Sequence, residues 1–195
     1  MDPPDKEMEN IEEYLKNYKK SKNTKWFEKI YNLMMPKIYR FYYLKTFSRE
    51  LSEDLTSEVF IRVYRNLDKI YLNKKTFTAW IYKIANNLLI DHFRKNKNSG
   101  LQVKLEEDLL KITAEDILIK NSGLLRKELG FTNISLLSAL DKLTGLQKDV
   151  VLLKFLEDMD YDTIASIFGK RVPTIRGILF RALTRLKEET RSING

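Results

Sequence analysis

Cysteine is absent from the 195 residues, and histidine occurs once, as His92. The missing thiols exclude disulfides, cysteine-ligated zinc and thiol catalysis, and they fit a protein of the reducing cytoplasm. One imidazole without a glycine-rich phosphate loop leaves little for metal or acid–base chemistry. We therefore expect no enzymatic activity, no metal and no cofactor, and we place His92 on the surface or at a helix end.

Long apolar runs are also missing, because no window approaches the roughly 18 apolar residues that span a bilayer. The first five residues are acidic and predict no secretory signal. Glycine (7) and proline (4) are scarce, whereas 43% of the residues are hydrophobic. This composition predicts a helical, globular, cytoplasmic protein that does not insert into membranes.

Acidic residues are outnumbered, and the net charge of +8 favours a polyanionic partner. Residues 1–98 hold 20 lysines and arginines against 13 acids, whereas residues 99–135 hold 5 against 6. Residues 170–187 hold six basic residues and no acid. The distribution suggests two nucleic-acid contacts joined by a connector, although a single charge run is commonly a solvated helix face.

Apolar residues recur at helical spacing through the first hundred residues. Asn23 or Thr24 is a candidate cap of the second predicted helix, and Ser48 or Ser52 of the third. The predicted helices are residues 11–20, a helix around Trp26–Phe41 kinked by Pro36, a helix ending near Asp68, and residues 77–94.

Residues 77–94 place aromatic, amide and basic side chains on one helix. Aromatic rings stack on bases, amides hydrogen-bond to base edges and cations bind phosphate, so the segment suggests a single-strand nucleic-acid surface. Core packing of the aromatic residues is the alternative, because one side of the helix is apolar. That side contains Ile81, Ile84, Ala85, Leu88 and Leu89.

Residues 162–187 predict a helix-turn-helix. A short helix over 162–168, with Ile164, Ala165 and Phe168 inward, is followed by a turn at Gly169-Lys170. The next helix begins near Pro173 and presents its N-terminal residues to the major groove. Its buried stripe is Ile175, Leu179, Ala182 and Leu186, and its outward residues are Thr174, Arg176, Gly177, Phe180, Arg181 and Thr184. An ordinary helical hairpin with a basic face is the alternative.

The chain resembles bacterial sigma-70 family RNA polymerase sigma factors of the extracytoplasmic-function (ECF) type, which contain only sigma regions 2 and 4. The first domain matches in Ser52–Tyr64, Phe77–Asn87 and Asp91–Arg94. The second domain matches in Leu140–Leu143, Gln147–Phe155, Ile164-Ala165, Thr174–Arg176 and Phe180–Ala182.

The resemblance implies an all-α protein of two small helical domains joined by a linker. Residues 10–98 would be the region 2 bundle, which docks on polymerase and melts the minus-ten element. Residues 99–134 would be the linker, and residues 135–190 the region 4 helix-turn-helix for the minus-thirty-five element. Expected partners are core RNA polymerase (the β′ clamp helices and the β flap), promoter DNA and an anti-sigma factor.

The same resemblance assigns site residues. Asp54, Ser57 and Glu58 would bind polymerase, and Ser57 replaces a glutamine that is common in the family. The minus-ten residues would be Lys74, Lys75, Phe77, Trp80, Lys83, Asn86, Asn87 and Arg94, of which Asn87 helps to hold a flipped base and Asn86 replaces a common arginine. The minus-thirty-five residues would be Lys170, Arg171, Thr174, Arg176, Gly177, Phe180 and Arg181, of which Gly177 replaces a common serine or threonine.

Two other functions remain open from the residues alone. A helix-turn-helix regulator would bind duplex DNA through residues 161–187 and would need neither a polymerase-docking helix nor a strand-opening helix. An interaction protein that has kept the sigma fold but lost promoter activity is the second alternative, because Gly177 and Ile178 depart from the family pattern.

Overall fold

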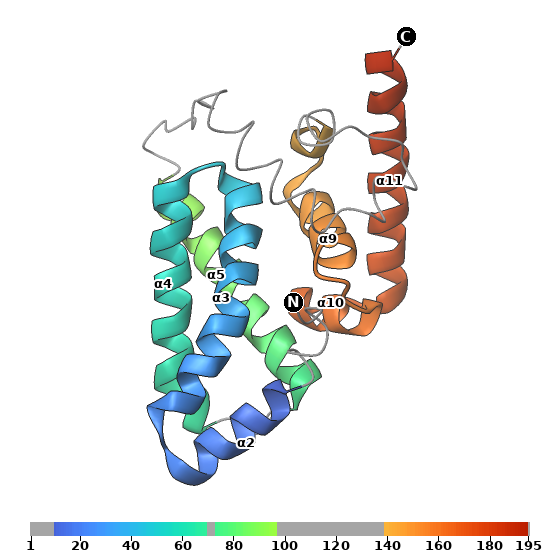
Figure 1. Cartoon of the computed structure of the whole chain (residues 1–195). Helices are drawn as coiled ribbons and strands as arrows, with labels where there is room; N and C mark the ends of the chain where they lie inside the picture. Colours follow the sequence, from blue (N-terminus) through green and yellow to red (C-terminus); the bar gives the residue numbers. More distant parts are fainter. Residues whose placement is uncertain (1–9, 70–72, 97–138, 195) are drawn as a thin grey trace. The chain divides into compact units, whose positions relative to one another are not determined.

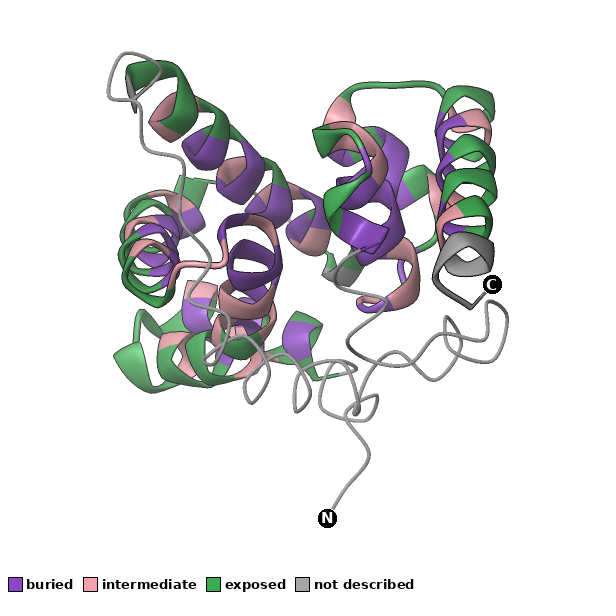
Figure 2. Cartoon of the chain, turned by 90° about the horizontal axis from the view of Figure 1, so that it is seen from above, coloured by how far each residue is buried: buried purple, intermediate pink, exposed green. Residues whose placement is uncertain are grey.

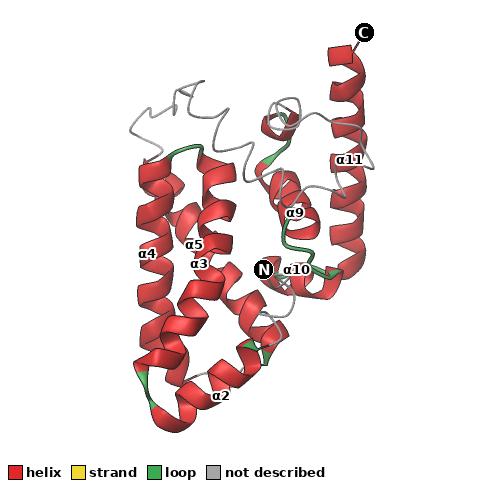
Figure 3. Ribbon diagram, viewed as in Figure 1, coloured by secondary structure: helices red, strands yellow, loops and turns green. Residues whose placement is uncertain are grey.

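The computed structural model describes residues 10–69, 73–96 and 139–194, which form helices joined by short loops (Figures 1 and 3). No strand occurs in this part of the chain. The chain divides into two compact units, Met1–Val103 and Lys104–Gly195. The predicted all-α class is confirmed. The predicted linker over 99–134 lies outside the described residues.

The first unit is a bundle in which α3 packs against α2, α4 and α5, and α4 also packs against α5. Figure 2 shows that its helices carry buried residues on one side and exposed residues on the other. Pro36 lies within α3, and the helix continues on both sides of it. The elements are α2 (Ile11–Ser21), α3 (Thr24–Thr46), α4 (Arg49–Asn66), the 3-10 turn η1 (Leu67–Lys69) and α5 (Lys74–Asn96).

Short polar side chains fix where these helices begin. The side chain of Asn23 accepts a hydrogen bond from the backbone N–H two residues later, at 2.9 Å. The Ser48 hydroxyl accepts one from the N–H three residues later, at 3.2 Å. The Asn73 side chain does the same at 2.9 Å. Because such caps satisfy otherwise unpaired N–H groups, they define the first turn, and α5 begins three residues before the predicted start.

Contacts between α3 and α5 fix how α5 is rotated in the bundle. The buried Tyr42 hydroxyl donates a 2.8 Å hydrogen bond to the backbone carbonyl of Ala85. Burial raises the pKa of Tyr42 far above its ordinary value. The rings of Phe41 and Tyr82 meet edge to face, with centroids 5.5 Å apart. With Tyr82 and Ala85 inward, the opposite side of α5 faces solvent.

The second unit contains the predicted helix-turn-helix. Its helices within residues 145–194 are α9 (Gly145–Phe155), α10 (Tyr161–Phe168) and α11 (Val172–Asn194), and α11 packs against both others. Asp160 caps α10 by accepting from the Thr163 N–H at 2.7 Å. Gly169 ends α10 with φ +60°, a left-handed conformation that favours glycine.

The buried residues predicted for the two helices of the helix-turn-helix are confirmed with one exception. In α10, Ile164 and Ala165 are buried as expected, but the third inward residue is Ile167, and Phe168 is only half-buried. The expectation for Phe168 was wrong because the helix ends there, and the chain turns away at Gly169. The predicted stripe of α11 is buried in full: Ile175, Leu179, Ala182 and Leu186.

Candidate polymerase and promoter interfaces

The polymerase-binding residues predicted from the sequence lie on one side of α4. Asp54 and Ser57 are exposed and Glu58 is half-buried, and spacings of three and four residues place them together. We call Asp54, Ser57 and Glu58 the docking face. Ile61 continues this face by one turn with 44% of its surface exposed. Ile61 was not among the predicted site residues, although its position off the buried Leu55–Val59–Val63 stripe was a usable signal.

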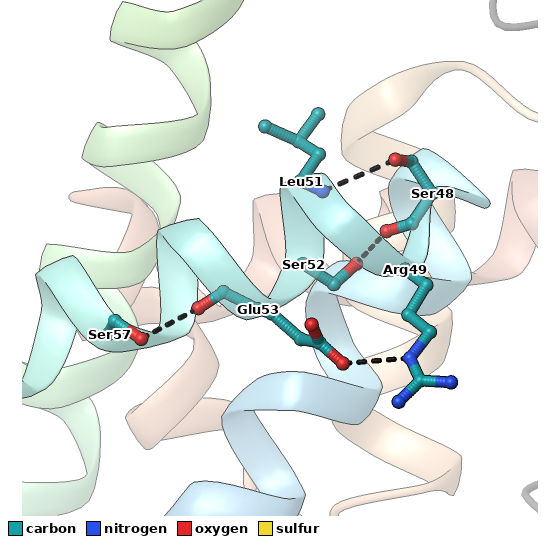
Figure 4. A network of polar contacts seen from close by, with 6 residues as sticks. All are labelled: Ser48, Arg49, Leu51, Ser52, Glu53 and Ser57. Carbon is teal, nitrogen blue, oxygen red and sulfur yellow. Dashed lines mark hydrogen bonds and ion pairs between the residues drawn. The ribbon is translucent and has the colours of Figure 1, made fainter.

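Hydrogen bonds within α4 hold the side chains around the docking face (Figure 4). The Ser57 hydroxyl donates to the backbone carbonyl of Glu53 at 2.9 Å. Glu53 accepts from Arg49 at 2.8 Å, and this hydrogen bond raises the pKa of Arg49. Glu58 accepts in the same way from Arg62, also at 2.8 Å. Both ion pairs are exposed, so they orient side chains and add little stability.

The exposed side of α5 contains part of the predicted minus-ten set. Lys83, Asn87 and Arg94 are exposed and lie on one line along the helix. Ile90 lies on the same line with 53% of its surface exposed, and it was not among the predicted minus-ten residues. Arg94 forms an exposed ion pair with Asp91 at 3.0 Å. A basic, amide and apolar stripe of this kind offers groups for phosphate, base edges and base faces at once.

Other predicted minus-ten residues lie elsewhere. Phe77 is fully buried and packs beside the half-buried Trp80, with ring centroids 6.0 Å apart. Asn86 is 8% exposed. These side chains support the helix, and Phe77 and Asn86 are not presented to solvent in this structure. Lys75 is exposed at the start of α5, and the side chain of Lys74 lies outside the described part.

The outward side of α11 brings together the predicted minus-thirty-five residues. Thr174, Arg176, Phe180 and Arg181 are exposed, and Gly177 is half-buried between them. We call these five residues the reading face. Among the large apolar side chains that the structure describes, Phe180 is the most exposed, at 73%. Lys170 and Arg171 are exposed in the turn before α11. The face combines donors for base edges with an apolar ring, as major-groove readout requires.

An aromatic ring from α10 lies beneath one side chain of the reading face. The Arg176 guanidinium lies over the Tyr161 ring, with 5.1 Å between the guanidinium carbon and the ring centroid. The Lys154 ammonium from α9 lies 5.4 Å from the same centroid. Neither Tyr161 nor Lys154 was among the predicted site residues, because only the packing of α9, α10 and α11 brings them to Arg176.

Neither a metal-binding cluster nor a membrane-spanning helix occurs among the described residues. Over residues 10–69, 73–96 and 139–194, no group of three or more histidine, cysteine or acidic residues could hold a metal ion. His92 is half-buried near the end of α5 and its ring contacts that of Phe93. None of the described helices is long and apolar enough to cross a membrane.

Comparison with protein families gives two matches that agree with the two units. The family model for sigma-70 region 2 matches residues 30–99. The family model for sigma-70 region 4 matches residues 134–186. Together the two models cover more than half of the chain. The two matches therefore place the chain in one class of proteins, the sigma-70 factors. A match to region 2 does not favour the helix-turn-helix regulator, which would not need that domain.

Characterised relatives narrow the class. The chain is 29% identical to the ECF RNA polymerase sigma factor BldN of Streptomyces coelicolor over 82% of this chain and 58% of that protein. It is 29% identical to the ECF RNA polymerase sigma factor SigW of Bacillus subtilis over 86% of this chain and 90% of that protein. The chain belongs to the sigma-70 family of RNA polymerase sigma factors and is of the ECF type.

Solved structures show the same fold. CnrH, in complex with the cytosolic domain of CnrY, superposes with a TM-score of 0.66 at 17% identity, over 93% of this chain and 98% of CnrH. The sigma factor RpoE of Bartonella quintana, crystallised with the anti-sigma factor NepR, gives a TM-score of 0.63 at 20% identity, over 85% and 96%. At these identities the likeness concerns the fold alone.

Proposed function

We propose that this protein binds core RNA polymerase and directs it to a small set of promoters. The observation that carries the proposal is the presence of a region 2 match and a region 4 match on one chain, each with an exposed basic face on a helix. In this proposal the domain of residues 10–98 docks on polymerase and opens DNA. The domain of residues 135–190 reads the duplex, and residues 99–134 link the two.

The docking face of α4 would bind the polymerase β′ clamp helices, and region 4 would contact the β flap. Asp54 supports this assignment because no described residue forms an ion pair with it, so its charge is available to a basic partner. Ile61 beside it supplies an exposed apolar contact. An apolar group bordered by charges is the common arrangement of a protein interface.

The α5 stripe would act on the minus-ten element. Lys83 and Arg94 would bind phosphate, and Asn87 would hydrogen-bond to an unstacked base, because an amide both donates and accepts. Strand opening costs a few kcal/mol per base, which stacking and phosphate contacts offset without covalent chemistry. The proposed function therefore needs no catalytic residue, metal or cofactor. It places the protein in the bacterial cytoplasm, where an anti-sigma factor would restrain it.

Run-off transcription tests the proposal directly. Purified protein is added to core polymerase with genomic fragments, including the fragment upstream of its own gene, and specific transcripts are expected. Absence of any protein-dependent transcript, despite binding to core polymerase, would instead support the interaction protein that has lost promoter activity.

Two variants on two templates then separate the DNA contacts. An arginine that reads a guanine edge confers about 1–3 kcal/mol of discrimination, so Arg176→Ala is expected to reduce transcription only where the minus-thirty-five element is intact. A lysine on phosphate acts on every sequence, so Lys83→Ala is expected to depress both templates and to matter less at low salt. Equal losses for Arg176→Ala on both templates would show that Arg176 contacts only the backbone.

A further inference from the structure

The Tyr161 ring lies where α9, α10 and α11 meet. Tyr161 is the first residue of α10 and is half-buried. Arg176 from α11 and Lys154 from α9 both lie over its ring, 5.1 and 5.4 Å from the centroid. The Lys154 ammonium is also held by the Met159 carbonyl, to which it donates at 3.0 Å. The beginning of α10 is fixed in turn by the Asp160 cap, so the ring is a fixed platform.

An aromatic ring and a carboxylate stabilise a neighbouring arginine side chain in different ways. The face of an aromatic ring attracts a guanidinium within about 6 Å but carries no net charge. A carboxylate beside Arg176 would neutralise it, compete with a base edge for its donors and repel nearby phosphates. None of the acids in the described part forms an ion pair with Arg176. The ring therefore orders Arg176 while leaving its full charge available to DNA.

Ordering before binding matters because a long side chain loses rotamer freedom when it contacts a base. Arg176 is exposed in the second turn of α11, where few neighbours would otherwise restrain it. Contact with Tyr161 removes part of that freedom in the unbound protein. Arg176 therefore loses less conformational entropy when it binds DNA than an unrestrained arginine would. This advantage applies only to the base pair that Arg176 contacts.

We propose that Tyr161 is a positioning residue that pre-orders Arg176 for guanine recognition in the minus-thirty-five element. This inference rests on the proposed function, in which Arg176 reads a base edge. Tyr161 itself touches no base in this arrangement and acts through Arg176. The matched substitutions are Tyr161→Phe, which keeps the ring, and Tyr161→Leu, which keeps apolar bulk but removes the ring face.

The test uses holoenzyme assembled from the full chain and core polymerase. Its preferred minus-thirty-five duplex is first selected from a random pool. Discrimination is then the affinity ratio between that duplex and variants changed at one base pair. Tyr161→Leu is expected to lower discrimination about two- to fivefold at the base pair read by Arg176, and nowhere else, whereas Tyr161→Phe keeps it. In an Arg176→Ala background, Tyr161→Leu should cause no further loss.

Three results would overturn the proposal in distinguishable ways. Unchanged discrimination by Tyr161→Leu, with a loss in Arg176→Ala, would reject the role of Tyr161 alone. No loss in Arg176→Ala would reject base reading by Arg176, and the role of Tyr161 with it. An equal loss at every base pair, or an equal loss when Arg176 is already alanine, would assign Tyr161 to general stability.

A measurement on the free protein keeps the test independent of DNA. Nuclei of the Arg176 side chain over the ring should show ring-current shifts that persist in Tyr161→Phe and vanish in Tyr161→Leu. Thermal unfolding of both variants checks that the domain is folded. Ring-current shifts absent from the parent protein would contradict the contact on which the proposal rests.

Discussion

Two glycines in the second unit are expected to respond in opposite directions to the same substitution. Gly177 lies within α11, where a Cβ atom would meet only the Arg181 Nη1 atom at 4.0 Å, an ordinary contact distance. Gly169 has open space around its Cα but adopts φ +60°. Sterics are therefore equivalent at the two sites, and the backbone conformation alone decides the sign of the change in stability.

The magnitudes follow from helix propensity and from the cost of left-handed backbone. Alanine is favoured over glycine inside a helix by about 1 kcal/mol, so Gly177→Ala should raise the free energy of unfolding by that amount. An L-residue in the left-handed region costs about 1–2 kcal/mol, so Gly169→Ala should lower it by a similar amount. For a domain of this size, each kcal/mol moves the melting temperature by about 4–8 °C.

Hydrogen exchange in the full chain is the appropriate assay. Both tryptophans, Trp26 and Trp80, lie in the first unit, so tryptophan fluorescence does not report on the second. Peptides from α9 and α11 should gain protection in Gly177→Ala and lose it in Gly169→Ala, while peptides from α3 and α4 stay unchanged. A change of the same sign in both variants would refute the reasoning, because the backbone conformations of the two sites predict opposite signs.

Transcription by the Gly177→Ala variant tests whether this glycine has a role in DNA binding. A side chain at this position would stabilise α11 and would meet no obstacle within the protein. If Gly177→Ala is more stable but transcribes less, the missing side chain serves close approach of α11 to DNA. Transcription equal to that of the parent protein would show that the glycine has no role in DNA binding.

Three further predictions concern the first unit. Glu58→Lys should weaken binding to core polymerase with little change in melting temperature; Glu53→Lys is the control, because it loses an equivalent 2.8 Å ion pair on the same helix but projects about 140° away from Glu58 around the helix axis. Asn87→Ala should impair strand opening more than closed-complex formation, and unchanged permanganate reactivity across the minus-ten region would reject the base-pocket assignment. Tyr42→Phe should lower the free energy of unfolding by about 1–2 kcal/mol at neutral pH, because the Ala85 carbonyl loses its buried 2.8 Å hydrogen-bond donor. Burial raises the pKa of Tyr42, so its contribution to stability is complete below the unfolded value of about 10 and falls as the pH rises above it. Between neutral pH and pH values above about 10, the free energy of unfolding should therefore fall less in Tyr42→Phe than in the parent protein. Denaturation of both proteins at the two pH values measures this difference.

Helix faces were predictable wherever a periodic pattern ran through the middle of an element. Ile175 and Leu179 repeat at four-residue spacing, and they are buried while Arg176 and Phe180 are exposed. Such a pattern depends only on residues within one helix, so it survives whatever the helix packs against. The prediction failed for Phe168, because a residue beside a chain reversal no longer follows the helical period.

The composition of a helix did not reveal which of its chemically suitable residues face solvent. Residues 77–94 held aromatic and amide side chains, and the sequence alone allowed either DNA contact or core packing for each. In the structure Asn87 is exposed, while its neighbour Asn86 and the ring of Phe77 are buried. That division follows from the rotation of α5, which the hydrogen bond from Tyr42 to Ala85 fixes across 43 residues of sequence.

The sequence by itself determined the helical periods and the two basic, motif-bearing segments, and it indicated the class of this protein through the resemblance of those motifs to sigma-70 factors. These properties belong to single segments of the chain or to its composition, so they do not depend on how the helices pack. Tertiary structure alone decided which side chains from different helices become partners. Tyr161 lies beneath Arg176, 15 residues away, because α9, α10 and α11 bury a common apolar core and bring their polar sides together at one point. No period within one helix encodes that meeting, since it depends on how the three helices pack.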